Sequence, residues 1–468
     1  MLQYTCNGRY IKGLISMNVV TQEKLMSLIE EYMSEYLEDP EFTLYLKEKL
    51  EKLHNKAKQH NVSDENVMTF VKSEIPTFLE NYESFKKTFK KQEEIRSTKL
   101  GISINFQLID LFEVIDTCQN DEEFIKMRDE YFQSLSSDPR FQGFNYIFNG
   151  LDSITLEEIK QIRHNILENV DCITPEWSGK MRMIVDQRKP LMIDDTINPE
   201  LFDFKYLDKF ADFARDNNMK IRLHTIVWHT QFPQFLKEAS KEETLLFLDK
   251  YMEELSIRYG DVAYAVDVLN EIASDDPGDP LRNSPWRDKL GDDYYIEILK
   301  IAKKNFPDIS VAYNEYGEEN PVKRGNVIEL VNRIKKVEQE EGITLLDVLG
   351  IQAHYNNFTT DTSIKSAFEE YSLLDKELQV TELDVGNQGQ SNDIDFQANR
   401  VYRTVMESSC LANIKLMNMW GVSSKISWKS EKVNTFLDDK GEISMYSQRL
   451  VNGFSEKSKE RDKSKIIV

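Results

Sequence analysis

Two glutamates that follow short apolar runs are the residues with which this sequence could do chemistry. Glu271 lies two residues after the run 262–269, and Glu382 lies two residues after the run 378–380. A single glutamate at the end of a strand is usually solvated or paired with a cation. Two glutamates on different strands of one sheet edge could act together, because hydrolysis of a glycosidic bond needs one carboxyl group to protonate the leaving oxygen and another to attack the anomeric carbon. The pair therefore predicts glycoside hydrolysis.

Aromatic and imidazole side chains accompany the two acids. Trp228, Trp420 and Trp428 lie in or beside predicted strand ends, where an indole face could stack on a pyranose ring. Packing in the core is the alternative for each tryptophan. His224 and His229 do not have the spacing that places two imidazoles on one metal ion. We expect an oligosaccharide cleft and no metal site.

The elements that must position these side chains alternate between strands and helices after residue 138. The apolar runs that predict strands include 262–269, 309–313, 345–351, 378–380 and 414–419. Amphipathic helical segments separate them, which is typical of a parallel sheet with helical crossovers. We therefore expect an α/β fold with a (β/α)8 barrel over residues 139–460. In such a barrel, polar residues at the carboxyl ends of the strands converge on one face.

The first part of the sequence has a different texture. Residues 1–138 contain amphipathic helical patterns, and Asn120 before three acidic residues predicts the start of a helix. We expect an α-helical N-terminal region of unknown role over 1–138 and a charged tail over 461–468.

Charge and cysteine content exclude several classes of protein. The 468 residues include 59 Lys and Arg against 81 Asp and Glu, so the net charge of -22 disfavours nucleic acid as a partner. Long uncharged runs that could span a membrane are absent from the sequence. Its four cysteines lie far apart, which indicates neither a zinc site nor a disulfide framework. We expect a cytoplasmic protein, or a secreted one if the chain lacks its natural signal peptide.

Several segments together resemble glycoside hydrolase family 10, the endo-1,4-β-xylanases. The segment 224–231 (HTIVWHTQ) resembles the H-T-L-V-W-H-S-Q of that family, and 266–271 (VDVLNE) resembles its W-D-V-V-N-E. The other similar segments are Asn314-Glu315-Tyr316, Gln352-Ala353-His354, Thr381-Glu382-Leu383-Asp384, Trp420-Gly421-Val422 and Ser427-Trp428. Their order and separations make the resemblance specific over about residues 140–455.

The resemblance implies a role for each matched residue. Glu271 would be the general acid/base and Glu382 the nucleophile of a retaining enzyme that forms a covalent glycosyl-enzyme intermediate and needs no cofactor. His354 and Asp384 would orient Glu382, and Asn270 would hold the 2-hydroxyl of the reacting sugar. The residues expected to bind the β-1,4-linked substrate are Asn270, Glu176, Trp177, Lys180, His224, Trp228, Gln231, Asn314, Gln352, Trp420 and Trp428.

Three positions depart from the family pattern. Trp177 replaces an asparagine that binds the adjacent glycone sugar, Ser424 replaces an aspartate after W-G-V-T, and Val266 replaces a tryptophan. The alternatives are therefore a related retaining β-glycosidase that acts on other β-glucans or on short xylo-oligosaccharides, and a non-hydrolytic carbohydrate-binding or scaffold protein whose N-terminal region has an unknown partner. The presence of both Glu271 and Glu382 argues against the non-hydrolytic alternative.

Overall fold

The computed structural model describes residues 99–141, 150–386, 394–412, 414–426, 436–438, 440–444 and 447–454. The chain divides into two units, Met1–Glu93 and Glu94–Val468, and the described residues all belong to the second. The predictions for residues 1–98 and for the tail 461–468 fall outside the described residues.

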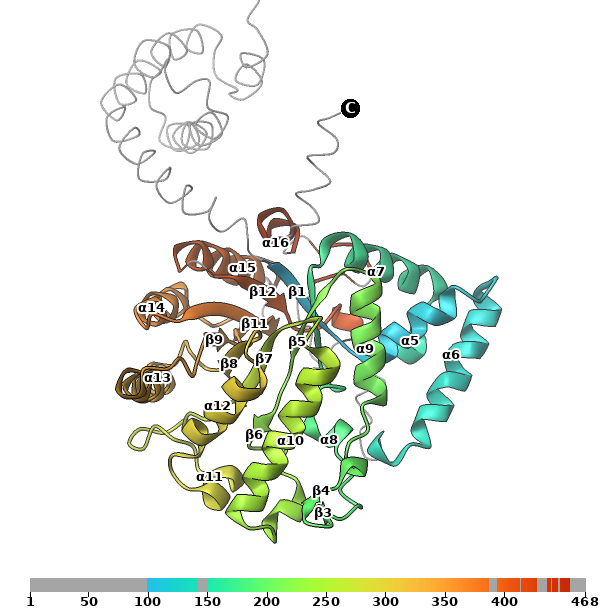
Figure 1. The fold of residues 1–468 in the computed structure, drawn as a ribbon. Helices are drawn as coiled ribbons and strands as arrows, with labels where there is room; N and C mark the ends of the chain where they lie inside the picture. The colour runs from blue at the N-terminus through green and yellow to red at the C-terminus, as the bar shows by residue number, and fades with distance from the viewer. Residues whose placement is uncertain are drawn as a thin grey trace, which may run out of the picture. The chain divides into compact units, whose positions relative to one another are not determined.

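A closed ring of eight parallel strands forms the centre of the second unit (Figure 1). Around the ring the strands are β1 (Lys99–Ile104), β2 (Cys172–Pro175), β5 (Lys220–Leu223), β7 (Ala263–Asn270), β8 (Ser310–Glu315), β9 (Val348–Ile351), β11 (Glu377–Gly386) and β12 (Leu416–Met419). Pairing of Lys99 on β1 with Leu416 on β12 closes the ring. The prediction of a (β/α)8 barrel is confirmed.

Two short strands extend the ring at its carboxyl edge. The strand β6 (Val227–Trp228) pairs with the end of β7, and β10 (His354–Asn356) pairs with the end of β11. Because both short strands carry predicted site residues, these pairings bring Trp228 and His354 to the edge where the two glutamates lie.

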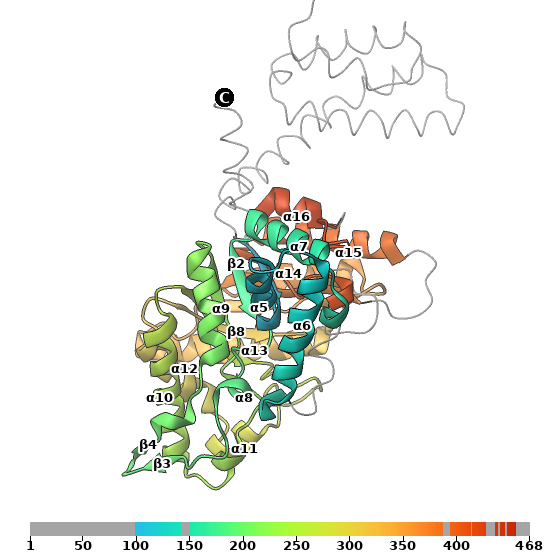
Figure 2. The same ribbon diagram turned by 90° about the vertical axis from the view of Figure 1, so that its right-hand side faces the viewer.

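Helices surround the ring (Figures 1 and 2). The longer ones are α5 (Phe106–Ile115), α6 (Asp121–Ser136), α7 (Leu156–Asn169), α9 (Lys205–Asp216), α10 (Lys241–Tyr259), α12 (Tyr294–Asn305), α13 (Pro321–Glu341), α14 (Asp361–Ser372), α15 (Ile394–Leu411) and α16 (Ser447–Phe454). Shorter elements are α8 (Met181–Ile184), α11 (Pro285–Leu290) and the hairpin of β3 (Met192–Ile193) with β4 (Thr196–Ile197). Capping boxes at Thr155 and Ser240 fix where α7 and α10 begin, because they satisfy backbone donors of the first turn.

The predicted boundary between the N-terminal region and the barrel is too late in the chain. The first barrel strand, β1, begins at Lys99, and α5 and α6 follow it before residue 138. Gly101 of β1 pairs in register with Asn418 of β12. A side chain at position 101 would collide with the Asn418 amide, so the pairing that closes the ring requires glycine there. The predicted helix start is confirmed, because Asn120 accepts a 3.0 Å hydrogen bond from the Glu123 amide.

A buried ion pair lies inside the ring. The Arg222 guanidinium donates from Nε to Asp267 Oδ2 at 3.1 Å and also contacts Gln379, and all three side chains are buried. A buried charge that lacks a partner destabilises the folded protein. Loss of Asp267 alone would therefore leave the buried guanidinium of Arg222 without its counter-ion. The pair is flanked by the apolar core between strands and helices.

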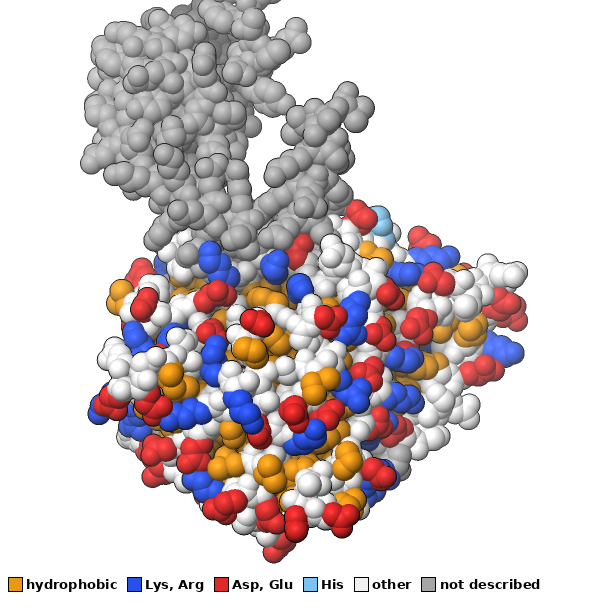
Figure 3. All heavy atoms as spheres, in the orientation of Figure 1, with side chains coloured by type: hydrophobic (Ala, Val, Ile, Leu, Met, Phe, Trp, Pro, Cys, Tyr) orange, Lys and Arg blue, Asp and Glu red, His pale blue; other side chains and the backbone are white. Residues whose placement is uncertain are grey.

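The outer surface carries both signs of charge. On the face drawn in Figure 3, acidic and basic side chains of the described residues are interspersed. Among the described residues, none of the helices has both the length and the apolar character that a membrane crossing requires.

Candidate active site

Glu382 on β11 is held by side chains from two other strands, β8 and β10. Asn314 of β8 donates from Nδ2 to Glu382 Oε1 at 2.7 Å, and His354 of β10 places Nε2 3.0 Å from Oε2. On the other side of the imidazole, Nδ1 lies 3.0 Å from Asp384 Oδ1. Glu382 is only 4% exposed, so these contacts fix its orientation.

The same contacts set the charge of this group. Burial alone would raise the pKa of Glu382, but the hydrogen bond from His354 and the charges of His224 and His354 lower that pKa to about 2. Burial alone would lower the pKa of His354, but Asp384 and Glu382 raise it to about 10. Near neutral pH, Glu382 is therefore an anion beside a charged imidazole.

Glu271 follows β7 in a backbone conformation that residues with a Cβ rarely adopt. Its φ of 56° lies in the left-handed region. The Glu271 amide donates to the Asn314 carbonyl at 2.9 Å, and Arg282 Nε donates to the Glu271 carbonyl at 2.9 Å. Its carboxylate accepts from Trp228 Nε1 at 2.7 Å and from Gln352 Nε2 at 3.2 Å. The backbone and the side chain of Glu271 are thus both held in place.

Amide side chains connect the two glutamates. Asn270 Oδ1 accepts from Asn314 Nδ2 at 2.9 Å and from Gln352 Nε2 at 3.4 Å. Since Asn314 also contacts Glu382 and Gln352 also contacts Glu271, one hydrogen-bonded chain joins the carboxylates through three amides. The structure therefore brings Glu271, Asn270, Asn314, Gln352 and Glu382 together at one edge of the ring.

A buried lysine lies among tryptophan rings beside this edge. Lys180 Nζ lies 4.7 Å from the ring centroid of Trp177, 4.9 Å from that of Trp228 and 6.0 Å from that of Trp420. Burial lowers the pKa of Lys180, and the charges of Glu382 and Glu176 oppose that shift.

Glu176 directly follows β2, four residues before Lys180 in the same connection. It accepts from Asn105 Nδ2 at 2.9 Å, and burial raises its pKa to about 7 against the opposing effects of Lys180 and Asn105. Trp177 is half-buried and packs against an apolar cluster that includes Phe106 and Met183. Both predicted residues therefore lie close to the lysine.

The remaining predicted residues have mixed positions. His224 Nδ1 lies 3.0 Å from Asp267 Oδ2, and its ring packs edge-on against Trp420 with centroids 5.4 Å apart. Gln231 Oε1 accepts from the Arg182 amide at 3.1 Å, so its side chain fixes the backbone at the start of α8. Trp428 lies outside the described residues.

Sequence reasoning missed the groups behind Glu271. Lys323 on α13 is buried, with Nζ 3.0 Å from Glu315 Oε1 and 2.8 Å from the Ala273 carbonyl. Glu315 Oε2 in turn accepts from the Ala273 amide at 2.9 Å, which fixes the chain just after Glu271. Glu315 could have been found, since it lies inside the Asn314-Glu315-Tyr316 segment, but nothing in the sequence near Lys323 indicates its partner.

A parallel barrel with two carboxylates joined across its carboxyl edge defines the class of protein as a glycoside hydrolase with a (β/α)8 fold. Residues 140–446 match the family described as glycosyl hydrolase family 10. The chain belongs to this family.

Individual relatives agree with that membership. Endo-1,4-beta-xylanase A of Caldicellulosiruptor saccharolyticus is 30% identical over 308 residues, which cover 59% of this chain and 82% of that protein. An exoglucanase, XynX of Acetivibrio thermocellus, is 31% identical over 248 residues, which cover 49% of this chain and 22% of that protein. The crystal structure of an endo-1,4-beta-xylanase from Caldicellulosiruptor owensensis is 25% identical, with a TM-score of 0.56, and the match covers 77% of this chain and 98% of that one.

Proposed function

We propose that this protein is a retaining endo-1,4-β-xylanase that hydrolyses xylan or xylo-oligosaccharides by double displacement. Membership of glycosyl hydrolase family 10 and the names of the similar xylanases support the substrate. The observation that carries the proposal is the hydrogen-bonded chain from Glu271 to Glu382. It holds two carboxylates with different surroundings together at the carboxyl edge of the barrel.

In the first step, Glu382 attacks the anomeric carbon while Glu271 protonates the leaving oxygen. The low pKa of Glu382 keeps it ionised as the nucleophile, and Asn314 and His354 prevent it from turning away. Trp228 and Gln352 hold the Glu271 carboxyl group in the orientation from which it can donate its proton. Asn270, between the two acids, is placed to contact the reacting sugar.

In the second step, water hydrolyses the glycosyl-enzyme. Glu271 gave its proton to the leaving oxygen in the first step, so its carboxylate can accept a proton from the water that attacks the anomeric carbon and releases Glu382. In the glycosyl-enzyme, the charged His354 lacks one of its two anionic partners, while Asp384 remains. Asp384 therefore keeps the imidazole in place for the return of the free carboxylate.

Lys180 and the tryptophans around it are proposed to bind the glycone sugars. The ammonium can donate to a sugar hydroxyl, and the rings of Trp177, Trp228 and Trp420 offer apolar faces within reach of the same substrate. His224, held by Asp267, is proposed to donate to the substrate through its other ring nitrogen.

Product analysis on defined oligosaccharides tests the proposal. Xylohexaose should be cut internally, and the first anomer released, followed by NMR, should keep the β configuration. Cellohexaose and mannohexaose are the comparison substrates, and the Glu382→Ala variant is the inactive control. Release of the inverted anomer, or the absence of hydrolysis of xylohexaose, would contradict the proposal.

Hydrolysis of other β-glucans is the second candidate. Trp177 favours it because an indole cannot copy the hydrogen bonds of the amide found in the family pattern, and one relative is named an exoglucanase. Faster hydrolysis of cellohexaose than of xylohexaose would support this alternative. The expectation of a cytoplasmic or secreted location stays a prediction that fractionation of the source cells can test.

A further inference from the structure

Phe358 is an exposed aromatic side chain at the tip of a turn. Phe358 is 66% exposed, and no other Phe, Tyr or Trp among the residues that the structure describes is exposed. Turn tips normally carry Gly, Asn, Asp or Ser, and an exposed phenylalanine gains nothing from burial there. The residue therefore calls for an explanation other than packing.

The turn that carries Phe358 is firmly held. The Thr359 amide donates to the Asn356 carbonyl at 3.0 Å, and the Phe358 amide donates to Asn356 Oδ1 at 2.8 Å. Arg400 of α15 donates to the carbonyls of Asn357 and Thr359 at 3.3 Å and 2.8 Å. With its backbone fixed at both ends, the turn presents the ring in a defined position.

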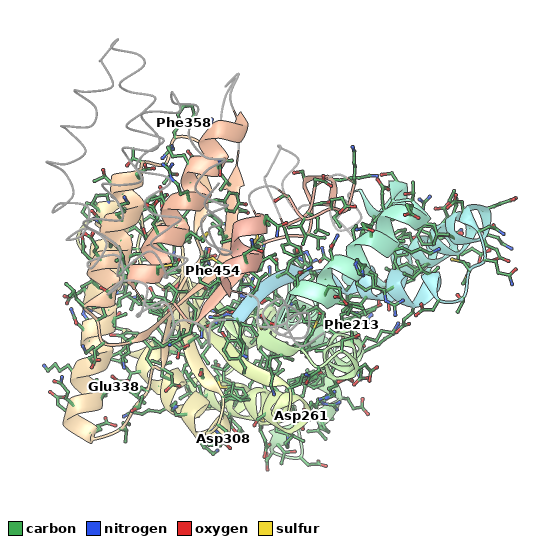
Figure 4. The ribbon with its side chains drawn as sticks, turned by 90° about the horizontal axis from the view of Figure 1, so that it is seen from above. Phe213, Asp261, Asp308, Glu338, Phe358 and Phe454 are labelled. Atoms are coloured by element: carbon green, nitrogen blue, oxygen red, sulfur yellow. The ribbon has the colours of Figure 1, made fainter. Side chains whose placement is uncertain are left out.

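This turn belongs to the same edge of the barrel as the two glutamates. Phe358 is four residues after His354, whose imidazole contacts Glu382, so the two Cα atoms are at most about 15 Å apart. Figure 4 shows Phe358 on the side of the molecule opposite to Asp261 and Asp308, which precede β7 and β8. An oligosaccharide that extends from the glutamates toward this turn would therefore meet the ring.

Phe358 also lies across the ring of strands from Trp177. In ring order, β2 and β9 are four positions apart among eight, so the connection after β2 and the segment after β9 lie on opposite sides. Lys180 and its tryptophan neighbours, which are proposed above to bind the glycone sugars, lie on the β2 side. With the glycone sugars on that side, the leaving group extends toward the opposite side, where Phe358 lies.

We propose that Phe358 is a stacking platform for a sugar on the leaving-group side of the cleavage point. This inference rests on the proposed xylanase function. The ring covers the apolar C–H face of a xylose unit, and that contact removes from water a surface that the free protein exposes. Phe358 would thus select for longer substrates and help to set where they are cut.

Three variants test the platform in the full chain. Phe358→Ala removes the ring, Phe358→Tyr keeps an aromatic face, and Leu373→Ala is the control. Leu373 is 80% exposed and follows α14, which places it near the start of β11, away from the carboxyl edge. The substrates are xylohexaose and 4-nitrophenyl β-xylobioside, whose small leaving group cannot reach the turn.

We expect Phe358→Ala to lower kcat/KM on xylohexaose about tenfold while its value on the aryl xylobioside stays within about twofold of the unmodified enzyme. Cleavage of reducing-end-labelled xylohexaose should move toward the reducing end, because fewer sugars are held on the leaving-group side. Phe358→Tyr and Leu373→Ala should keep the original cleavage pattern.

Two kinds of failure are distinguishable. An unmodified enzyme that does not cut xylohexaose would overturn the proposed function and, with it, the identity of the bound sugar. An active enzyme whose cleavage pattern is unchanged by Phe358→Ala would overturn the platform alone. Equal losses on both substrates, or a shift in pattern with Leu373→Ala, would also overturn it, since either result indicates a general structural effect.

Discussion

The surroundings of Glu382 and Glu271 differ in charge and in exposure. The side chain of Glu382 is 6% exposed and contacts a charged imidazole, whereas that of Glu271 is 15% exposed and contacts the neutral donors of Trp228 and Gln352. His229 Nδ1 is 3.7 Å from Glu271, but burial lowers the pKa of His229 and favours its neutral form, despite the opposing charge of Glu271.

This difference fits two different tasks. A nucleophile must stay ionised and aligned, so a fixed cation beside Glu382 is an advantage. A general acid/base must gain and lose a proton within one catalytic cycle, and a permanent positive charge at that site would hold it in the ionised form. The neutral donors of Trp228 and Gln352 fix the orientation of the Glu271 carboxyl group and place no positive charge beside it.

Removal of each carboxylate should give the largest effects and separate the two roles. Glu382→Ala should lower kcat by about 10⁵-fold on every substrate, because no nucleophile remains. Glu271→Ala should cost about 10³-fold on xylohexaose but far less on an activated aryl xylobioside, whose leaving group needs little protonation. Steady-state rates on the two substrates give both values.

Glu340→Ala is a matched control, since that glutamate is 62% exposed on α13. It should leave both rates unchanged. Equal losses by Glu271→Ala on both substrates would contradict its role as acid.

The strand ends that carry these glutamates were predictable from the sequence, whereas the start of the barrel was not. Apolar runs ending in polar residues gave β7 and β11 close to their observed positions. The strand β1 is only six residues long and lies within the region 1–138 that the helical patterns dominate, and residue 138, the predicted boundary, follows the end of α6. Ring closure with β12 involves residues more than 300 positions apart, which no local pattern can indicate.

The supporting contacts of the site were only partly predictable. The family pattern implies the roles of His354 and Asp384, and the structure places His354 beside Glu382 and Asp384 on the other side of the imidazole. Lys323 lacked any such signal, because its partner Glu315 precedes it on another element and meets it only in the folded chain. Phe358 lies in a turn, where hydrophobic periodicity carries no information.

Replacement of His354 should make the site of Glu382 resemble that of Glu271. His354→Asn removes the imidazole whose hydrogen bond and charge, together with the charge of His224, lower the pKa of Glu382 to about 2. We expect kcat/KM to fall about 100-fold and its acid limb to move up toward the ordinary carboxyl range near 4.3. A pH profile from 3 to 8 on the aryl xylobioside measures the shift, and an unmoved acid limb would show that His354 does not set this pKa.

The same histidine should leave a signature in stability. Its folded-state pKa of about 10 lies above the ordinary value near 6.5, so the stability it contributes is fully present below about pH 6.5 and is lost as the pH rises toward 10. Urea unfolding across this range should show a decline for the unmodified protein that His354→Asn reduces. Parallel declines in both proteins would assign the loss to other groups.

Removal of one neutral donor from Glu271 should have a smaller effect. Trp228→Phe keeps an aromatic ring but deletes the 2.7 Å hydrogen bond from Nε1 to Glu271 Oε2. We expect kcat on xylohexaose to fall about tenfold, the range of one hydrogen bond to a charged group, with little change in the acid limb set by Glu382. A shift of that acid limb equal to the one in His354→Asn would erase the distinction between the two sites.

The smallest effect concerns Trp177, which is proposed to bind a glycone sugar by apolar contact in place of the hydrogen bonds of an amide. Its ring lies 4.7 Å from Lys180 Nζ and packs on the cluster that includes Phe106 and Met183. An apolar surface rejects a wrong sugar only modestly, whereas a buried polar group left unpaired rejects it strongly. Trp177→Asn should therefore raise the ratio of kcat/KM on xylan to that on β-glucan by about 1 kcal/mol, or roughly fivefold. Trp177→Phe, which keeps an apolar ring, should leave the ratio unchanged, and an unchanged ratio in Trp177→Asn would assign the indole to packing alone.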